Sequence, residues 1–304
     1  MPLSAAEPQT VDNPADPPAL VRLSDLLSDW QTDAEAAYQS RETNTPRGPV
    51  TGLTRLDREL GNHLAPGLHI LHGEPGTGKT ALALQVAARC KSPALYLSAE
   101  MGALELARRI TARATQTYLG RLKSGELPPV RSLELLLEAA KSAPALHLAD
   151  ASRGALASSA WILSTVTDLQ QQAGKAPLVV VDSLHSWAET CTPAGYSEYD
   201  ALNIALSDLR RVAQVAQVPV LCVAERNRAT MKQGGLSAAA GTRKFEYGAE
   251  SVWSLKREED TPIEEEYAVT LTLSKNRGGS PGAKVALLFH GALQQFREDP
   301  GAGV

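Results

Sequence analysis

The stretch that decides the fold is LHILHGEPGTGKTALALQVAARC, residues 68–90. Its first five residues form an apolar run that predicts a short buried strand over 68–72. The apolar residues after the glycines predict a helix that runs through about Cys90 and ends before Pro93. Between the two lies GEPGTGKT, Gly73 to Thr80, which matches the pattern G-x-x-x-x-G-K-[ST]. A strand before this pattern and a helix after it are the context in which such a loop binds phosphate.

Each position of this loop has an expected role. Gly73, Gly76 and Gly78 let the backbone turn tightly and bring its N–H groups onto phosphate oxygens. We expect Lys79 to reach the β- and γ-phosphates of ATP and the Thr80 hydroxyl to bind Mg²⁺. The predicted nucleotide-binding residues are Gly73, Glu74, Pro75, Gly76, Thr77, Gly78, Lys79 and Thr80. A chance match in a glycine-containing loop is the alternative, and the flanking strand and helix argue against it.

Outside this loop, strands and helices are expected to alternate over residues 49–298. Apolar runs predict strands over 94–98, 145–149, 177–182 and 218–224, and helices are expected over 103–118, 132–142, 158–173 and 199–216. Shorter strands without helices between them follow at 251–255, 267–273, 284–290 and 293–296. The predicted fold is α/β, with a mostly parallel sheet, helices on both faces and antiparallel hairpins at the C-terminal end.

Two acidic residues are expected beside the phosphate loop, because ligands of an open α/β sheet bind at the carboxyl ends of its strands. Asp182 ends the run PLVVVD and is predicted to hold Mg²⁺. Glu100 follows the strand ALYLS and is predicted to orient and deprotonate the attacking water. For each acid, the alternative is a solvated side chain in a loop.

Composition limits the classes of function that fit the chain. The formal net charge is −4, so any contact with nucleic acid must come from a local basic patch. The three cysteines have no metal-binding spacing, and their odd number suits a reducing compartment. Since no apolar run is long enough for a membrane helix and no secretory signal is visible, we expect a cytoplasmic protein without membrane contact.

The N-terminal part of the chain differs from the rest. Residues 1–20 are rich in Pro, Asp and Ala and predict a flexible tail, and 299–304 form a second short tail. Residues 21–41 place apolar side chains on one face of a predicted helix, and a polar linker follows up to residue 48. The predicted ATPase domain then covers 49–298.

The ordered set of motifs resembles one family. TGLTRLDREL (51–60), YLSAEM (96–101), VVVDSLHSW, SDLRRVAQVAQVPVLCVAERNR (207–228), FEYGAESVWSLKRE (245–258) and SKNRGG (274–279) follow the order of the C-terminal ATPase domain of DnaB-type replicative helicases. That family belongs to the RecA/KaiC/RadA superfamily. The resemblance implies a RecA-like fold, an ATP-hydrolysing motor, a ring usually of six subunits, and ATP bound at subunit boundaries.

The resemblance also assigns roles to residues far from the phosphate loop. Lys275 and Arg277 match the residues that act as a finger in the neighbour's site, where two cations neutralise charge on the γ-phosphate. The alternative is an exposed basic pair on a hairpin. The segment 21–41 matches a linker helix that packs on the adjacent subunit, although packing on its own domain is also possible.

Single-stranded DNA is the expected partner. The acid-free segment 226–244 corresponds to a region that faces the central channel in the family, and its cations are suited to phosphate backbone contact. The predicted DNA-binding residues are Arg226, Arg228, Lys232, Arg243 and Lys244. Trp187 and Tyr196 form a second candidate, either stacking on bases or filling a local core.

Two features depart from the family pattern. A short tail stands where the family has an N-terminal helical domain, which questions a role in primosome assembly. Glu225 stands at the γ-phosphate sensor position, where the family has Gln, and a carboxylate there repels phosphate. We therefore keep two alternatives beside the DNA motor: a RadA-like recombination ATPase, and a nucleotide-dependent regulatory or assembly ATPase that does not bind DNA.

Overall fold

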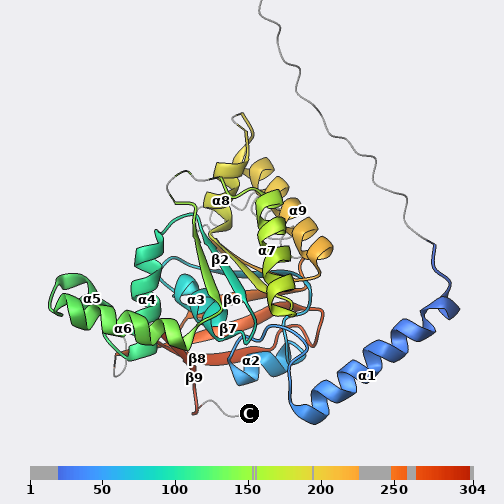
Figure 1. The fold of residues 1–304 in the computed structure, drawn as a ribbon, viewed down its shortest axis with the longest axis horizontal. Coiled ribbons are helices and arrows are strands. Elements are labelled where there is room, and N and C mark those ends of the chain that lie inside the picture. Colours follow the sequence, from blue (N-terminus) through green and yellow to red (C-terminus); the bar gives the residue numbers. More distant parts are fainter. Residues whose placement is uncertain are drawn as a thin grey trace, which may run out of the picture. The chain divides into compact units, whose positions relative to one another are not determined.

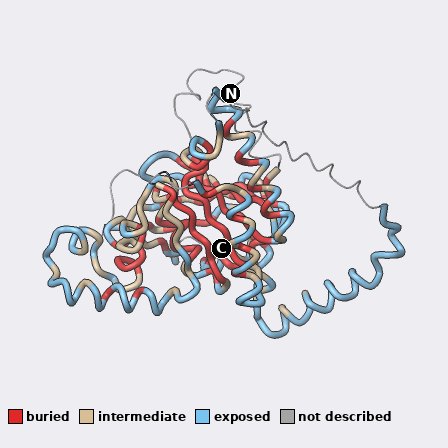
Figure 2. Tube along the Cα trace, turned by 45° about the horizontal axis from the view of Figure 1, so that its top comes forward, coloured by how far each residue is buried: buried red, intermediate tan, exposed pale blue. Residues whose placement is uncertain are grey.

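The computed structural model describes residues 20–152, 154, 156–193, 195–225, 248–258 and 265–301 (Figure 1). The chain divides into two units, Met1–Arg47 and Gly48–Val304. In the first unit, the 3-10 helix η1 (Leu23–Leu26) leads into helix α1 (Leu27–Thr43), and no residue of either is buried (Figure 2). Most of the predicted N-terminal tail lies outside the described residues.

The second unit is built on one sheet, in which the described strands follow the order β3-β2-β4-β5-β1-β6-β7-β8-β9. Its parallel strands are β1 (Gly67–Gly73), β2 (Ala94–Ser98), β3 (Leu146–Asp150), β4 (Leu178–Asp182), β5 (Pro219–Glu225) and β6 (Ser251–Arg257). Three antiparallel strands extend it at one side: β7 (Glu266–Asn276), β8 (Lys284–His290) and β9 (Gln295–Glu298). The predicted mostly parallel sheet with C-terminal antiparallel hairpins is confirmed.

Helices cover both faces of this sheet, as predicted. One hydrophobic cluster joins the sheet to α2 (Thr54–Glu59), α3 (Lys79–Arg89), α4 (Ala103–Thr115) and α6 (Pro129–Ser142). A second cluster joins the other face to α7 (Ser159–Ala173), α8 (Leu184–Cys191) and α9 (Glu198–Ala216). Neighbouring strand residues belong to opposite clusters, as Ile70 and Leu71 do, which explains why the central strands are apolar without alternation. Buried residues accordingly concentrate in the strands (Figure 2).

Several short elements differ from the expectation. Helices α2, α8 and α5 (Leu119–Ser124) were not predicted, because six to eight residues carry too few periodic positions to reveal a helix. Helix α4 ends at Thr115 rather than near 118, since Gln116 adopts a left-handed conformation that stops it. Strand β7 is longer than predicted and reaches Asn276.

Parallel pairing brings the carboxyl ends of the central strands to one edge of the sheet. Gly73 at the end of β1 is paired with Glu225 at the end of β5, and Ser98 of β2 is paired with Asp182 of β4. The phosphate-loop pattern and the predicted acids therefore reach the same edge.

Candidate nucleotide-binding site

The loop between β1 and α3 has the backbone conformation that its glycines predict. Gly76 and Gly78 have φ angles of 80° and 91°, which a residue with a side chain rarely adopts. A Cβ atom on Gly78 would also lie 2.8 Å from the ring of Phe296, and one on Gly73 would lie 2.5 Å from the Leu255 carbonyl. Arg257 supports the loop from the side by donating to the Gly76 carbonyl at 2.6 Å. Glycine is therefore favoured for conformation at Gly76 and Gly78, and for space at Gly73 and Gly78.

Lys79 lies buried at the start of α3, with its ammonium group folded back on the loop. Its Nζ donates to the carbonyls of Gly73 and Glu74 at 3.0 and 3.1 Å. Burial lowers the pKa of Lys79, and the charges of Glu225, Asp182 and Glu100 act in the opposite direction. The cation thus lies among three carboxylates, and its two carbonyl contacts are ones that phosphate oxygens can replace.

Asp182 and Thr80 form a second pair beside the lysine. Asp182 is buried at the end of β4, where it accepts hydrogen bonds from the Tyr96 hydroxyl at 2.6 Å and from the Thr80 side chain. Burial raises the pKa of Asp182, although these hydrogen bonds oppose that shift. A carboxylate beside a hydroxyl supplies the hard oxygen ligands that Mg²⁺ prefers, with phosphate and water completing the shell. The residues present therefore fit a magnesium ion, and no cluster of three His, Cys, Asp or Glu side chains suited to another metal occurs among the described residues.

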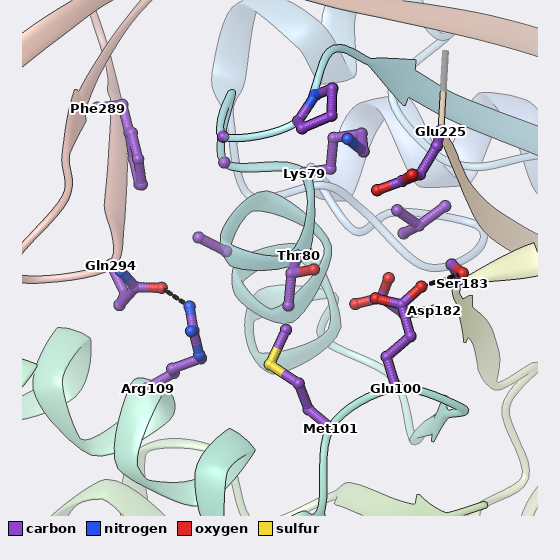
Figure 3. A pocket seen from close by; sticks show the side chains of 15 residues that line it. Lys79, Thr80, Glu100, Met101, Arg109, Asp182, Ser183, Glu225, Phe289 and Gln294 are labelled. Atoms are coloured by element: carbon purple, nitrogen blue, oxygen red, sulfur yellow. Dashed lines mark hydrogen bonds between the residues drawn. The ribbon is translucent and has the colours of Figure 1, made fainter. Parts of the chain in front are cut away.

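Glu100 points into the same cavity from the loop after β2 (Figure 3). Its Oε1 accepts hydrogen bonds from the hydroxyls of Ser183 and Ser186, the latter at 3.0 Å. Ser183 directly follows the strand that carries Asp182, and Ser186 lies in the first turn of α8; neither is singled out from the sequence as a partner of Glu100. They fix the carboxylate, and the position of Ser183 immediately after Asp182 was the available signal.

The opposite wall of the cavity contains residues that sequence reasoning missed. Arg109 of α4, Phe289 of β8 and Gln294 lie on the far side of the phosphate loop from the acids (Figure 3). Arg109 donates to Gln294 at 2.5 Å, and Phe289 stacks on Phe296 with ring centroids 4.4 Å apart. The cavity has a volume of about 290 Å³. No motif joins these residues, because the packing of α4 and of the C-terminal hairpin against α3 brings them together.

Glu225 also lines this cavity, at the exposed end of β5. It is the carboxylate with the largest electrostatic effect on Lys79. The predicted sensor position therefore lies beside the lysine and not in a distant loop.

Lys275 and Arg277 lie at the other edge of the sheet. Asn276, between them, is paired with Ser251 at the start of β6, whereas the phosphate loop lies beside Leu255 near the end of that strand. Because β7 runs antiparallel, its last residues reach the edge where the parallel strands begin. The two cations therefore cannot contact the nucleotide cavity of their own chain.

The predicted DNA contacts have two outcomes. Arg226, Arg228, Lys232, Arg243 and Lys244 lie outside the described residues. Trp187 is fully buried and donates its Nε1 hydrogen to the Ala157 carbonyl at 2.8 Å. The suggestion that Trp187 stacks on bases is therefore wrong, because its ring fills the core beneath α8; Tyr196 is exposed.

A phosphate loop with acids from neighbouring strand ends around its lysine is the arrangement of P-loop nucleotide-binding proteins. The order of the strands and the antiparallel extension place it on a RecA-like sheet. The chain belongs to the family described as "DnaB-like helicase C terminal domain", whose model matches residues 48–298.

Two curated relatives support this assignment. The chain is 26% identical over 282 residues to the replicative DNA helicase DnaB of Treponema pallidum (strain Nichols), covering 90% of this chain and 61% of that protein. It is 24% identical over 288 residues to the replicative DNA helicase DnaC of Bacillus subtilis (strain 168), covering 91% and 62%. The chain thus spans about three-fifths of the length of these relatives.

Solved structures agree on the fold. A structure described as an ATPase domain matches with a TM-score of 0.72 at 21% identity, covering 88% of this chain and 98% of that one. A DnaB-like replicative helicase, described with its interactions with primase, matches with a TM-score of 0.71 at 20% identity, covering 90% and 71%. Separately, the described part of the chain contains no helix of the length and apolar character needed to cross a bilayer.

Proposed function

We propose that this chain is an ATP-hydrolysing DNA motor of the DnaB type that acts as an oligomeric ring on single-stranded DNA. The observation that carries the proposal is the convergence of Lys79, Asp182 and Glu100 on one cavity in a chain of this family. The family match favours this function over the RadA-like alternative. The free thiols of Cys90, Cys191 and Cys222 support a site of action in the reducing cytoplasm.

In this mechanism the loop amides and the N-terminus of α3 bind the phosphates of ATP. Lys79 exchanges its two carbonyl contacts for phosphate oxygens. Thr80 and Asp182 would hold Mg²⁺, which would neutralise phosphate charge there. Glu100, held by Ser183 and Ser186, accepts a proton from the attacking water. Phe289 and Arg109 are proposed to contact the base. They line the side of the cavity that lies opposite the acids, across the phosphate loop.

We further propose that Lys275 and Arg277 act on the nucleotide of an adjacent subunit. Their position at the far edge of the sheet supports action between subunits, because it excludes action on their own site. An arginine supplied in this way accelerates hydrolysis by about 10³–10⁵ in related enzymes. The basic residues of 226–244 are proposed to follow the DNA backbone.

The test compares the ATPase rate of the full chain with and without single-stranded DNA, followed by strand displacement on a forked duplex. We expect DNA to stimulate hydrolysis and the forked duplex to be unwound. Glu100→Gln should bind ATP normally and lose both activities, because it keeps the shape of the side chain without its basicity. Hydrolysis that is insensitive to DNA, with no displacement, would instead identify a regulatory ATPase.

A further inference from the structure

The turn that carries Arg277 is fixed against the end of α2. Asn276, which is 8% exposed, donates its side-chain amide to the Glu59 carbonyl at 2.6 Å and accepts from the backbone N–H of Gly278 at 3.1 Å. A Cβ atom on Gly279 would lie 2.6 Å from the same Glu59 carbonyl, so the turn is in close contact with the helix. The backbone at Arg277 is therefore held in a defined position against the end of α2.

Glu250 holds Arg277 at two points. The backbone N–H of Arg277 donates to the Glu250 carbonyl at 2.9 Å, and its guanidinium Nη1 lies 3.0 Å from Glu250 Oε1. Glu250 is itself tied to β1, since its N–H donates to the Leu68 carbonyl at 2.7 Å. Gly67 has a φ angle of 138°, and a Cβ atom there would lie 2.3 Å from Glu250 Cγ. The absence of a side chain at Gly67 makes room for the carboxylate.

The ion pair leaves the arginine able to bind a further anion. The Arg277 side chain is 55% exposed, while that of Glu250 is 26% exposed, so the guanidinium extends beyond the carboxylate. The contact with Oε1 uses one nitrogen, Nη1, of a group that has five N–H donors. A free arginine loses rotamer entropy when it is fixed, and a side chain already held in place loses less.

We propose that Glu250 is a positioning residue that orients Arg277 toward the γ-phosphate of a nucleotide bound by the adjacent subunit. This inference rests on the proposed action of Arg277 between subunits. Glu250 does not contact the nucleotide; it acts through the guanidinium. The two residues are 27 positions apart and meet only because β7 returns beside the start of β6.

The experiment measures kcat and KM for DNA-stimulated ATP hydrolysis by the full chain and by Glu250→Ala, Glu250→Gln, Arg277→Ala and the double variant Glu250→Ala/Arg277→Ala. We expect Glu250→Ala to lower kcat about tenfold with KM within about twofold of wild type, because an oriented group affects the reacting geometry more than ATP binding. Glu250→Gln should recover most of the rate, since its amide oxygen still accepts from Nη1. The double variant should match Arg277→Ala alone.

Controls separate this inference from the proposal beneath it. Glu134→Ala removes the partner of Arg131 on α6 and should keep wild-type kinetics, and the oligomer mass of every variant is measured. If Arg277→Ala is slow while both Glu250 variants keep the wild-type kcat, the positioning role of Glu250 is wrong. The proposed action of Arg277 on the adjacent subunit is then unaffected. A double variant much slower than Arg277→Ala also overturns the role, because Glu250 would then act by another route. If Arg277→Ala is fully active, the finger and the positioning role fail together.

Discussion

Glu225 is the residue whose chemistry fits least well with a phosphate beside Lys79. It lines the cavity from the end of β5 and adds a negative charge where the γ-phosphate is proposed to lie. We predict that Glu225→Gln lowers the KM for ATP about fivefold and increases the DNA-stimulated rate, since removing about 1 kcal/mol of repulsion has that effect on affinity. Steady-state kinetics with and without DNA check this. Identical constants for the two proteins would make Glu225 incidental.

His69 is a buried polar residue outside the nucleotide cavity. Its Nε2 lies 2.9 Å from the Ala65 carbonyl, which only accepts, so Nε2 carries the hydrogen and Nδ1 accepts from Ser251 Oγ at 2.7 Å. Trp253 Nε1 donates to the same Ser251 oxygen at 2.6 Å. The network is complete with a neutral imidazole, and burial lowers the pKa of His69 to about 4.

This lowered pKa predicts a loss of stability in acid. The unfolded chain binds a proton near pH 6.5 and the folded chain only near pH 4, so the free energy of unfolding falls as the pH drops through that window, by about 3 kcal/mol in all. Urea unfolding at a series of pH values measures the slope. His69→Gln should reduce the dependence of the free energy of unfolding on pH relative to wild type. His147→Gln, at an exposed position, should leave this dependence unchanged. The variant comparison isolates His69 from Asp182, whose raised pKa acts with the opposite sign.

At the scale of elements, the C-terminal hairpin is part of the nucleotide site. Gln85 of α3 is fully buried and donates to the Phe296 carbonyl at 2.8 Å while accepting from its N–H at 2.9 Å, so α3 binds β9 as a neighbouring strand would. Phe296 in turn lies against Gly78 of the phosphate loop. The C-terminal hairpin therefore fixes both α3 and the phosphate loop that precedes it.

We predict that Gln85→Leu lowers the free energy of unfolding by about 2–4 kcal/mol, because two buried backbone groups lose their partners. ATP affinity should fall as well, since Phe296 no longer holds its place beside the loop. Denaturant unfolding and binding of a fluorescent ATP analogue measure the two effects. Gln171→Leu changes an exposed side chain on α7 and is the matched control. Wild-type stability in Gln85→Leu would show that β9 is held by other contacts.

The sequence predicted those elements and residues whose signal is local. Asp182 and Glu100 were found because each follows an apolar run, and the phosphate loop because its chemistry requires fixed spacing. Arg109, Phe289 and Gln294 share no local pattern, since the packing of α4 and the hairpin brings them together. The sequence allows two roles for Trp187, because an aromatic residue after a strand suits a core as well as a surface. Pairing of β6 with β7 likewise decides that Glu250 meets Arg277.

At the scale of the whole molecule, two partners for α1 are distinguishable by experiment. Trp30 is 77% exposed, and Leu23 and Leu27 are also exposed, so the first unit presents apolar side chains that a stable protein usually covers. The resemblance to the helicase family assigns this helix to an adjacent subunit, and packing on its own chain is the alternative. The two differ in what the loss of the helix removes: assembly in the first case, stability in the second.

We predict that deleting residues 1–47 lowers the oligomer mass and abolishes DNA-stimulated hydrolysis, while each subunit still binds ATP through the intact phosphate loop. Light scattering gives the mass, and binding of a fluorescent ATP analogue reports on the loop. The variant Leu27→Ser/Trp30→Ser, which removes apolar contact area without shortening the chain, should act in the same direction but less strongly, since burial contributes about 1.5–3 kcal/mol for each large apolar side chain. An unchanged mass with a lower melting temperature would place α1 against its own chain instead, and the ring would then be held by other surfaces.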